Sequence, residues 1–392
     1  MKKLFQNLLL LFCLISISGN ALAQQGSKDF NPILTTMPSM SISPDARAGG
    51  MGDAGVATAP DVYSQHWNAS KYAFATSSSG FALSYTPWLR KLVDDIALMQ
   101  AVGFFKLGSN DDQAISGSIR YFKIGDINIF DMHGENINSI SPNEMSIDLG
   151  YSRKLSQTFS MAVALRWLHS DYSGASDEIS AGNTVAADIS GYNESYIFLG
   201  NSESLLSFGV NLSNLGGKMS IDDNATKQFI PANMRIGASL MYPMNDVSTL
   251  SFSADMNKLL VPTPPIMGES ESREEYMKRV EEYNNTSSIS GIFKSFGTAD
   301  GGFSEKMKEL VWSFGAEYDY DGKFRVRSGY YHENKMKGNR RYMTFGAGFK
   351  LSAFQLDAAY LLSTAGQANP LDQTLRFSLA FDTDGIKRMV NR

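Results

Sequence analysis

The feature that most constrains this chain is an alternation of large apolar residues with small or polar ones, which recurs from residue 80 to residue 382. In the segment 159–167, every second residue is large and apolar, and the residues between them are Ser, Ala or Arg. The segments 206–212 and 375–381 repeat the alternation. A period of two puts successive side chains on opposite faces of a β-strand, so each segment is predicted to be a strand with one apolar face.

The sequence holds about fourteen such runs, an even number of the kind that bacterial outer-membrane barrels have. Their centres lie near residues 84, 101, 118, 149, 164, 190, 208, 237, 254, 315, 328, 346, 358 and 378. The connections between the runs alternate in length. The short ones are 108–112, 155–158, 200–203, 243–247, 319–323 and 351–353, and the long ones are 125–143, 173–182, 216–231, 261–308 and 333–341.

This alternation predicts an all-β fold, a transmembrane antiparallel up-and-down β-barrel over residues 80–382, because such barrels have short periplasmic turns and long extracellular loops. We expect residues 24–79 to form a periplasmic tether, over 24–42, and an N-terminal plug in the barrel lumen. If the first strand begins at the plug on the periplasmic side, the alternation of short turns and long loops brings the last strand back to that side. Both chain ends are then predicted to be periplasmic, with residues 383–392 as a periplasmic tail.

A soluble β-sandwich also alternates, but its outer face would carry many Lys and Glu residues. Here the second face of the predicted strands is rich in Ser, Gly, Asn and Ala, with sparse charges that suit a lumen. These charges are Arg120, Asp148, Arg166, Arg235, Asp255, Glu317, Arg325, Arg327, Asp357 and Arg376. Aromatic residues near strand ends are typical of the girdles at membrane interfaces. They are Tyr85, Trp88, Tyr151, Trp167, Tyr242, Trp312, Tyr330 and Tyr360.

The N-terminus has the pattern of a secretory signal peptide over residues 1–23. Lys2 and Lys3 precede an apolar run that is too short to span a bilayer as a helix, and an A-x-A-like cleavage site follows. Cleavage would remove Cys13, the single cysteine, so we expect no disulfide and no cysteine metal site. Loss of the two lysines makes the formal net charge of −5 more negative, which argues against a nucleic-acid partner.

The segment 43–74 is rich in small residues and contains a G-x-G-x-x-G spacing. A dinucleotide site needs an apolar strand before these glycines and an amphipathic helix after them, whereas Pro44 and Pro60 flank the motif here. Small residues also let a backbone fold tightly in a confined space, so we predict a plug that fills the lumen. Its candidate structural residues are Asp45, Arg47, Gly50, Gly52, Asp53, Gly55, Trp67 and Asn68.

The long connection 261–308 is predicted to contain helices. Ser272 and Glu275 have the spacing of a capping box, and two apolar stripes follow. The first stripe consists of Tyr276, Val280 and Tyr283, and the second of Ile289, Ile292, Phe293 and Phe296. The loop could be a lid that packs on the barrel mouth or a surface that docks a partner, and the sequence leaves both interpretations open.

The sequence does not predict an enzyme. None of the four histidines, His66, His133, His169 and His332, has metal-ligand spacing to another. His169, Ser170 and Asp171 are adjacent, but neighbouring side chains of a strand point to opposite faces and a catalytic triad is assembled from separated positions. We expect no cofactor and no metal.

Two pieces of the segment 43–74 carry a family resemblance. They are SPDARAGGMGDAGVATAPD, residues 43–61, and HWNASKYAF, residues 66–74. Together they resemble the N-terminal region of the PorV (LptO) family of the Bacteroidetes type IX secretion system. That family is similar to the FadL/OmpP1 barrels, whose plug pattern ends W-N-P-A. This chain has Trp67-Asn68-Ala69-Ser70 and so departs from the wider pattern at the proline.

The resemblance implies an outer-membrane shuttle rather than an enzyme. Such a protein binds the C-terminal signal domain of secreted cargo at the translocon barrel and delivers it to sortase and attachment-complex proteins at the cell surface. Outer-membrane lipid and LPS would surround the barrel. A FadL-like transporter of hydrophobic small molecules and a lipid A deacylase are the alternatives. The plug separates the shuttle from the transporter, because a transporter needs a lumenal or lateral path past it. The lack of a catalytic constellation argues against the deacylase.

Overall fold

The computed structural model describes residues 30–88, 95–108, 111–130, 133–174, 179–222, 227–268, 270–297, 302–365 and 372–390. The predicted signal peptide over residues 1–23, with Cys13, lies outside the described residues. So do residues 24–29 of the predicted tether.

Fourteen antiparallel strands close into one barrel, in which each strand pairs with its neighbours along the chain and β1 pairs with β16. The barrel strands are β1 (Ser79–Pro87), β2 (Ala97–Leu107), β3 (Gln113–Lys123), β6 (Asn143–Lys154), β7 (Phe159–Asp171), β8 (Gly182–Leu199), β9 (Ser202–Gly216), β10 (Asn233–Asn245), β11 (Ser248–Leu259), β12 (Val311–Tyr320), β13 (Phe324–His332), β14 (Arg341–Leu351), β15 (Phe354–Ser363) and β16 (Leu375–Asp382). Every predicted strand centre falls within one of them, so the predicted barrel is confirmed. The strands β4 (Ile127–Phe130) and β5 (Asn136–Ile140) form a separate hairpin, which the sequence did not predict.

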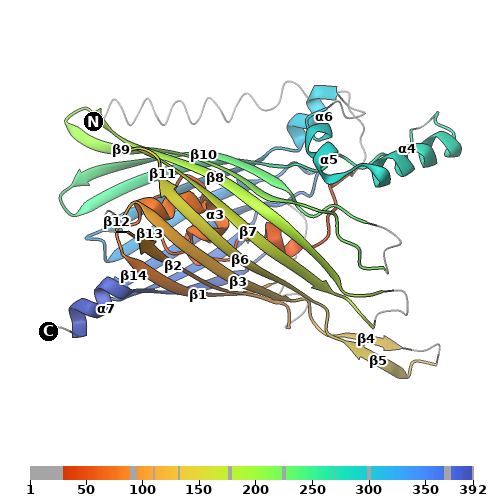
Figure 1. Cartoon of the computed structure of the whole chain (residues 1–392), viewed down its shortest axis with the longest axis horizontal. Coiled ribbons are helices and arrows are strands. Elements are labelled where there is room, and N and C mark those ends of the chain that lie inside the picture. The colour runs from red at the N-terminus through yellow and green to blue at the C-terminus, as the bar shows by residue number, and fades with distance from the viewer. Residues whose placement is uncertain are drawn as a thin grey trace.

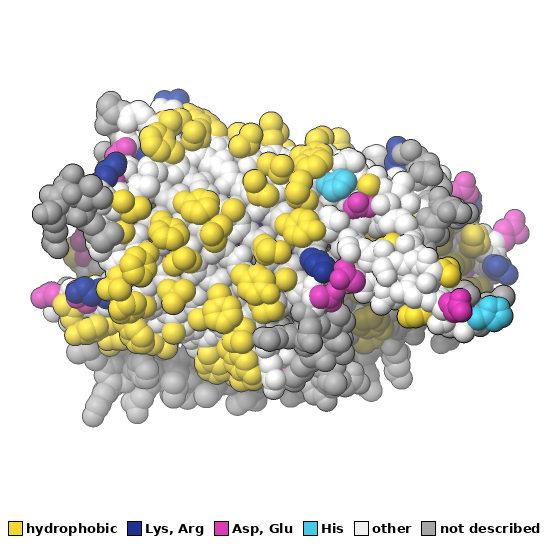
Figure 2. Space-filling view, turned by 90° about the horizontal axis from the view of Figure 1, so that it is seen from below, with side chains coloured by type: hydrophobic (Ala, Val, Ile, Leu, Met, Phe, Trp, Pro, Cys, Tyr) yellow, Lys and Arg dark blue, Asp and Glu magenta, His cyan; other side chains and the backbone are white. Residues whose placement is uncertain are grey.

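The alternation along each strand separates two faces of the wall. On β7, Met161, Val163 and Leu165 are exposed on the outside, whereas Ala162 and Ala164 are buried toward the lumen. Figure 2 shows apolar side chains spread over the middle of the outer wall, with charged ones gathered toward the two ends. Apolar surface of this extent would be unfavourable in water, and it is the outer surface that a lipid bilayer accommodates.

The charges predicted for the second face do point inward. All of them are buried except Arg325, which is half-buried. Among the predicted girdle aromatics, Tyr85 and Tyr151 are exposed on the outer wall. Trp88 differs, since it packs against a buried cluster that contains Ile42 and Phe122. It therefore covers the inside of the barrel and does not belong to an interfacial girdle.

The two ends of the barrel differ in the length of their connections (Figure 1). Tight turns between β6 and β7, β8 and β9, β12 and β13, and β14 and β15 lie at one end, together with α7 (Thr383–Val390). We call this the short-turn end. The β4–β5 hairpin and the helices α4 (Arg273–Asn285), α5 (Ser288–Lys294) and α6 (Gly302–Lys308) lie at the other, the long-loop end. No helix among the described residues is long and apolar enough to cross a membrane.

The described part of the predicted tether, residues 30–42, enters the barrel at the long-loop end, whereas the sequence predicted it at the end of the short turns. The Asn31 N–H donates to the Met336 carbonyl at 2.9 Å, and the Thr36 N–H donates to the Phe229 carbonyl at 3.0 Å. Both acceptors lie in long connections. The first and last described residues therefore lie at opposite ends of the barrel, so the prediction that both chain ends share the periplasmic side does not agree with the structure.

From this entry the chain passes through the lumen as four short helices, η2 (Pro38–Ser41), α2 (Ala46–Gly49), α3 (Ser64–Trp67) and η3 (Ala69–Phe74), and then continues into β1. Nearly every side chain between residues 39 and 75 is buried or half-buried. In Figure 1 these helices, drawn in red and orange, lie within the ring of strands. We call residues 37–75 the plug.

Candidate functional site

The plug is built around Asp45, whose side chain is fully buried. Its backbone is extended, and its carboxylate accepts the Ala48 N–H at 2.8 Å, which caps the first turn of α2. The Trp67 Nε1–H donates to the other carboxylate oxygen at 2.7 Å, so Asp45 joins α2 to α3. Burial, together with the nearby charge of Asp61, raises the pKa of Asp45 to about 6.

Arg47 ties the plug to the wall through a buried chain of ion pairs. Its guanidinium lies 2.6 Å from Asp61 within the plug and 3.0 Å from Glu317 on β12. Arg327 on β13 continues the chain, 2.6 Å from Glu317 and 2.7 Å from Asp357 on β15. Removal of one partner from a buried ion pair typically costs about 3–5 kcal/mol, because the other charge stays buried and unpaired.

The remaining predicted polar residues of the plug contact other strands. Asp53 lies 2.5 Å from Arg376 on β16 and accepts the Tyr342 hydroxyl of β14 at 2.5 Å. The Asn68 Nδ2 donates to the Gly191 carbonyl of β8 at 3.0 Å. The plug is thus held from several sides of the ring.

The glycines of the G-x-G-x-x-G spacing serve close packing. A Cβ on Gly50 would lie 3.0 Å from the Gly346 Cα of the wall. Gly52 has φ +68°, and a Cβ there would lie 2.6 Å from the Tyr330 nitrogen. A Cβ on Gly55 would lie 2.4 Å from the Trp67 ring. The backbone N–H groups of Gly55 and Val56 donate to Asp255 of β11, so these donors hold a wall carboxylate rather than a phosphate.

Sequence reasoning missed several plug residues. Asp61 completes the Arg47 ion pairs, and Lys71 is fully buried, with its Nζ 2.8 Å from the Gly55 carbonyl. Burial lowers the pKa of Lys71 to about 8. His66 is buried and contacts Arg120 of β3. These residues lie in a segment without periodicity, so only the fold brings their partners to them.

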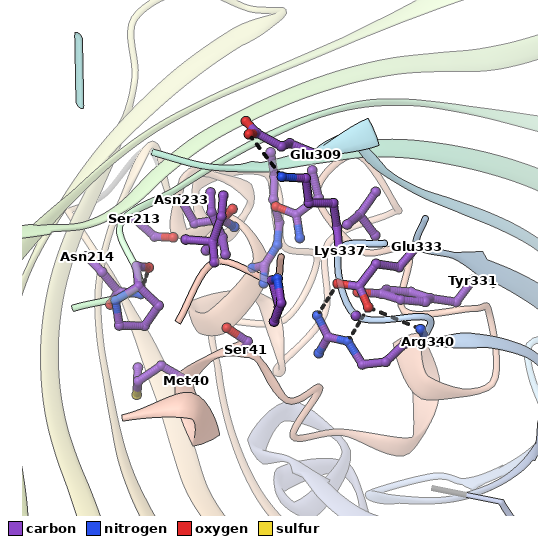
Figure 3. Close-up of a pocket in the computed structure, with 18 of the residues that line it drawn as sticks. Met40, Ser41, Ser213, Asn214, Asn233, Glu309, Tyr331, Glu333, Lys337 and Arg340 are labelled. Carbon is purple, nitrogen blue, oxygen red and sulfur yellow. Dashed lines mark hydrogen bonds and ion pairs between the residues drawn. The ribbon is translucent and has the colours of Figure 1, made fainter. Parts of the chain in front are cut away.

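Two cavities flank the plug. The one toward the long-loop end, the mouth cavity, has a volume of about 280 Å³ and is shown in Figure 3. Its lining includes Met40 and His66 of the plug, Asn233 and Arg235 of β10, Asn257 of β11, and Glu309, Glu333, Lys337 and Arg340. The cavity at the short-turn end has a volume of about 380 Å³, and Arg47 and Asp61 are among the residues that line it. The two share no lining residue.

Ion pairs hold the loops around the mouth cavity. Lys258 lies 2.8 Å from Glu309, and Arg340 lies 2.8 Å from Glu333. Figure 3 shows the Arg340–Glu333 pair and the contact between Lys337 and Glu309. Burial alone would raise the pKa of Glu309, but the hydrogen bonds from Lys258 and Thr263 and the nearby ammonium charges bring it below its ordinary value.

The long connection carries the two predicted apolar stripes on separate helices. The capping box of Ser272 and Glu275 at the start of α4 is confirmed. Tyr276, Val280 and Tyr283 are half-buried, and the Tyr283 ring packs edge-to-face on Phe229 with 5.6 Å between centroids.

The second stripe is split. Ile292 is half-buried, and Gly291 is buried beside Phe229 and Pro262. Ile289, Phe293 and Phe296 are exposed by 71%, 73% and 54%, and Phe296 lies beyond the end of α5. Phe303 on α6 is exposed by 81%. We call Ile289, Phe293, Phe296 and Phe303 the exposed apolar surface. Phe296 also lies beside the wall, since the Lys258 Nζ of β11 is 5.6 Å from the centroid of its ring.

The histidines form no catalytic group with their sequence neighbours. His169 lies on the outside, where its Nδ1 is 3.0 Å from the Asn183 amide oxygen, whereas Ser170 is buried on the other face of β7. Among the residues that the structure describes, no group of three His, Cys, Asp or Glu side chains could hold a metal ion.

Comparison with known proteins gives one family. Residues 25–266 match the model of the type IX secretion system protein PorV, and no curated protein matches. Among solved structures, the toluene transporter TodX of Pseudomonas putida is similar with a TM-score of 0.50 and 10% identity, over 90% of this chain and 99% of that one. A FadL homologue of Pseudomonas aeruginosa has a TM-score of 0.43 and 10% identity, over 90% of this chain and 99% of that one. At these identities the likeness shows the fold alone.

Proposed function

This chain belongs to the PorV family of type IX secretion system proteins, and we propose that within that system it is an outer-membrane adaptor that holds secreted cargo by a C-terminal signal domain. In this proposal the long-loop end faces the cell exterior, as is usual for the long loops of outer-membrane barrels. The translocon barrel supplies the cargo, and sortase and attachment-complex proteins receive it. The chain acts by binding and catalyses no reaction.

The observation that carries the proposal is the exposed apolar surface on α5 and α6. Ile289, Phe293 and Phe303 are among the most exposed large apolar side chains of the described residues. The helices α5 and α6 that carry them lie at the long-loop end of the barrel (Figure 1). Exposed apolar side chains that cluster outside the membrane often mark contacts with another protein. If the loop were only a lid, these exposed side chains would point toward the barrel mouth. The half-buried stripe of α4 already provides such a packing contact, since its Tyr283 ring packs on Phe229.

The plug supports an adaptor over the alternative of a transporter for hydrophobic small molecules. Its ties to β8, β12, β14 and β16 are buried ion pairs and hydrogen bonds, and the cavities on its two sides share no lining residue. A transporter would have to break several of these contacts in every cycle. The third alternative, a lipid A deacylase, has no observation in its favour.

The test replaces Ile289, Phe293 and Phe296 together with Ser. Each side chain that a partner fully buries contributes about 1.5–3 kcal/mol, so the triple variant should lose most of its bound cargo. Ile292 is left in place because it is half-buried and supports α5. The measurement is the amount of cargo and sortase that co-purifies with the protein from outer membranes after chemical crosslinking.

The matched control replaces three exposed polar residues of α4, Lys278, Glu281 and Glu282, with Ser. Both variants should keep the heat-modifiable migration of a folded barrel, because the loop lies outside the wall. If the triple apolar variant retains as much cargo and sortase as the control, the exposed surface does not dock a partner and the proposal loses its main support.

A further inference from the structure

The mouth cavity contains buried polar atoms that have no partner in the protein. Asn233 and His66 are each 6% exposed. Among the described residues, the Oδ1 atoms of Asn233 and Asn257 and the Nε2 atom of His66 are buried and make no hydrogen bond. All three residues line the cavity. An unsatisfied buried polar atom costs about 1–3 kcal/mol, so three beside one cavity indicate that something other than the protein satisfies them.

The strand register brings these groups together. Arg235 on β10 lies directly opposite Asn257 on β11, and Asn233 lies opposite Ser213 on β9. Because these residues share the inward face of three neighbouring strands, their side chains border one region of the cavity. Figure 3 shows Asn233 and Ser213 next to each other at the cavity wall. His66 reaches the same region from the plug, since its carbonyl accepts the Arg235 Nη1–H at 3.2 Å.

Arg235 is a buried cation without an ion pair. It is 6% exposed, and its guanidinium lies over the Trp67 ring, 4.9 Å from the centroid. No carboxylate oxygen of the described residues forms an ion pair with it, whereas Arg166 lies 2.5 Å from Asp148 and Arg340 lies 2.8 Å from Glu333. A buried charge is costly unless it is paired, so Arg235 is suited to receive an anion.

His66 adds a donor beside this cation. Its Nδ1 lies 2.8 Å from Arg120 Nη1. A guanidinium can only donate, so Nδ1 is the acceptor. Burial, helped by the charges of Arg235 and Arg120, keeps the pKa of His66 well below its usual range. The ring is therefore neutral at pH 7, and its one proton is on Nε2, the atom without a partner.

We propose that the mouth cavity binds a small organic acid, with the carboxylate held by Arg235 and the His66 Nε2–H, and with an adjacent hydroxyl or N–H group held by Asn233 and Asn257. The volume of about 280 Å³ suits a ligand, or the end of a ligand, of this size. One guanidinium without an ion pair matches the single charge of a carboxylate, since the other cations that line the cavity are already paired with carboxylates. A free hydroxy or amino acid has this chemistry, and so does the C-terminal end of a peptide.

The experiment measures binding of three probes to the full mature protein in detergent by saturation-transfer NMR. Glycolate tests a free acid, N-acetyl-triglycine tests a peptide end, and N-acetyl-triglycinamide lacks the carboxylate. At least one of the two acids should bind, and the amide should not. If glycolate binds, the natural ligand is a free small acid. If N-acetyl-triglycine binds and glycolate does not, the natural ligand is the C-terminal end of a peptide. If neither acid binds, or if the amide binds as well as its acid, the proposal is wrong.

Arg235→Gln should weaken acid binding at least tenfold, and Arg325→Gln, on the wall near the short-turn end, should leave it unchanged. Equal binding to the Arg235→Gln variant and the unaltered protein would overturn the assignment. Thermal unfolding separates this role from a structural one. The acid that binds should raise the unfolding temperature of the unaltered protein and leave that of Arg235→Gln unchanged, whatever the variant loses with the His66 hydrogen bond and the Trp67 contact; an equal rise in both proteins would show that Arg235 has only a structural role. The outcome does not depend on the docking surface of α5 and α6.

Discussion

The substitution Arg47→Met tests how firmly the plug is seated. Arg47 pairs with Asp61 and Glu317, and all three side chains are buried or nearly so. Methionine keeps much of the side-chain volume but leaves Asp61 without its arginine, while Glu317 retains Arg327 at 2.6 Å. The cost should therefore lie near the lower end of the range for a broken buried pair, about 3 kcal/mol. A loss of that size raises the ratio of loosened to seated plug roughly 150-fold.

The assay is single-channel recording in planar bilayers. Arg47→Met should show brief openings that the unaltered protein shows far less often, and a deletion of residues 45–72 should conduct continuously while the barrel stays heat-modifiable. The matched control is Arg325→Met, which removes a wall ion pair with Asp319 and should leave the openings unchanged. If the deletion conducts but Arg47→Met and the unaltered protein behave alike, the Arg47 ion pairs do not hold the plug in place. If even the deletion does not conduct, residues 45–72 do not close the lumen.

Two further predictions concern the plug backbone and the outer loop. Gly52→Ala should destabilise the plug, because Gly52 has φ +68° and the new Cβ would meet the Tyr330 nitrogen at 2.6 Å. Faster amide exchange of residues 45–55 measures this effect, and the control is Gly200→Ala, which also has a positive φ of +64° but no atom within 4 Å of the new Cβ. The folded-state pKa of Glu309 lies below its ordinary value of 4.5, so its stabilising contribution is complete above about pH 4.5 and is lost as the pH falls through the lowered value. Limited proteolysis of residues 302–310 should accelerate in that acidic window, and a Glu309→Gln variant whose proteolysis depends on pH to the same extent would rule out this role.

The barrel could be predicted from the sequence because lipid on one side and a polar lumen on the other force the same alternation on every strand. The β4–β5 hairpin escaped prediction because it stands clear of the barrel, where Ile127, Ile137 and Phe130 are all exposed and no buried face imposes a period. The direction of the N-terminal segment was predicted wrongly for a related reason. Its polar composition suits either end of a barrel, and only contacts such as that of Asn31 with Met336 decide between them.

The candidate sites were predictable to different degrees. Asp45, Arg47 and Asp53 stood out as charges among small residues, and each meets a buried partner. The exposed stripe was found by helical spacing, but the half-burial of Ile292 depends on how Gly291 packs beside Phe229. The mouth cavity could not have been found in this way. Asn233, Asn257 and His66 are ordinary polar residues far apart in the sequence, and they meet through strand register and the path of the plug.

The path of the N-terminal segment constrains the order in which the molecule can assemble. The plug joins β1 through only residues 76–78, and the Ala46 N–H donates to the Ser378 hydroxyl of β16. The seam that closes the cylinder is the pairing of these same two strands. An already closed cylinder would have to be threaded by the chain from the short-turn end to the long-loop end. Assembly is simpler if the N-terminal segment first lies across the sheet before it closes. The last strand, β16, then pairs with β1, and this closure of the seam traps the plug inside.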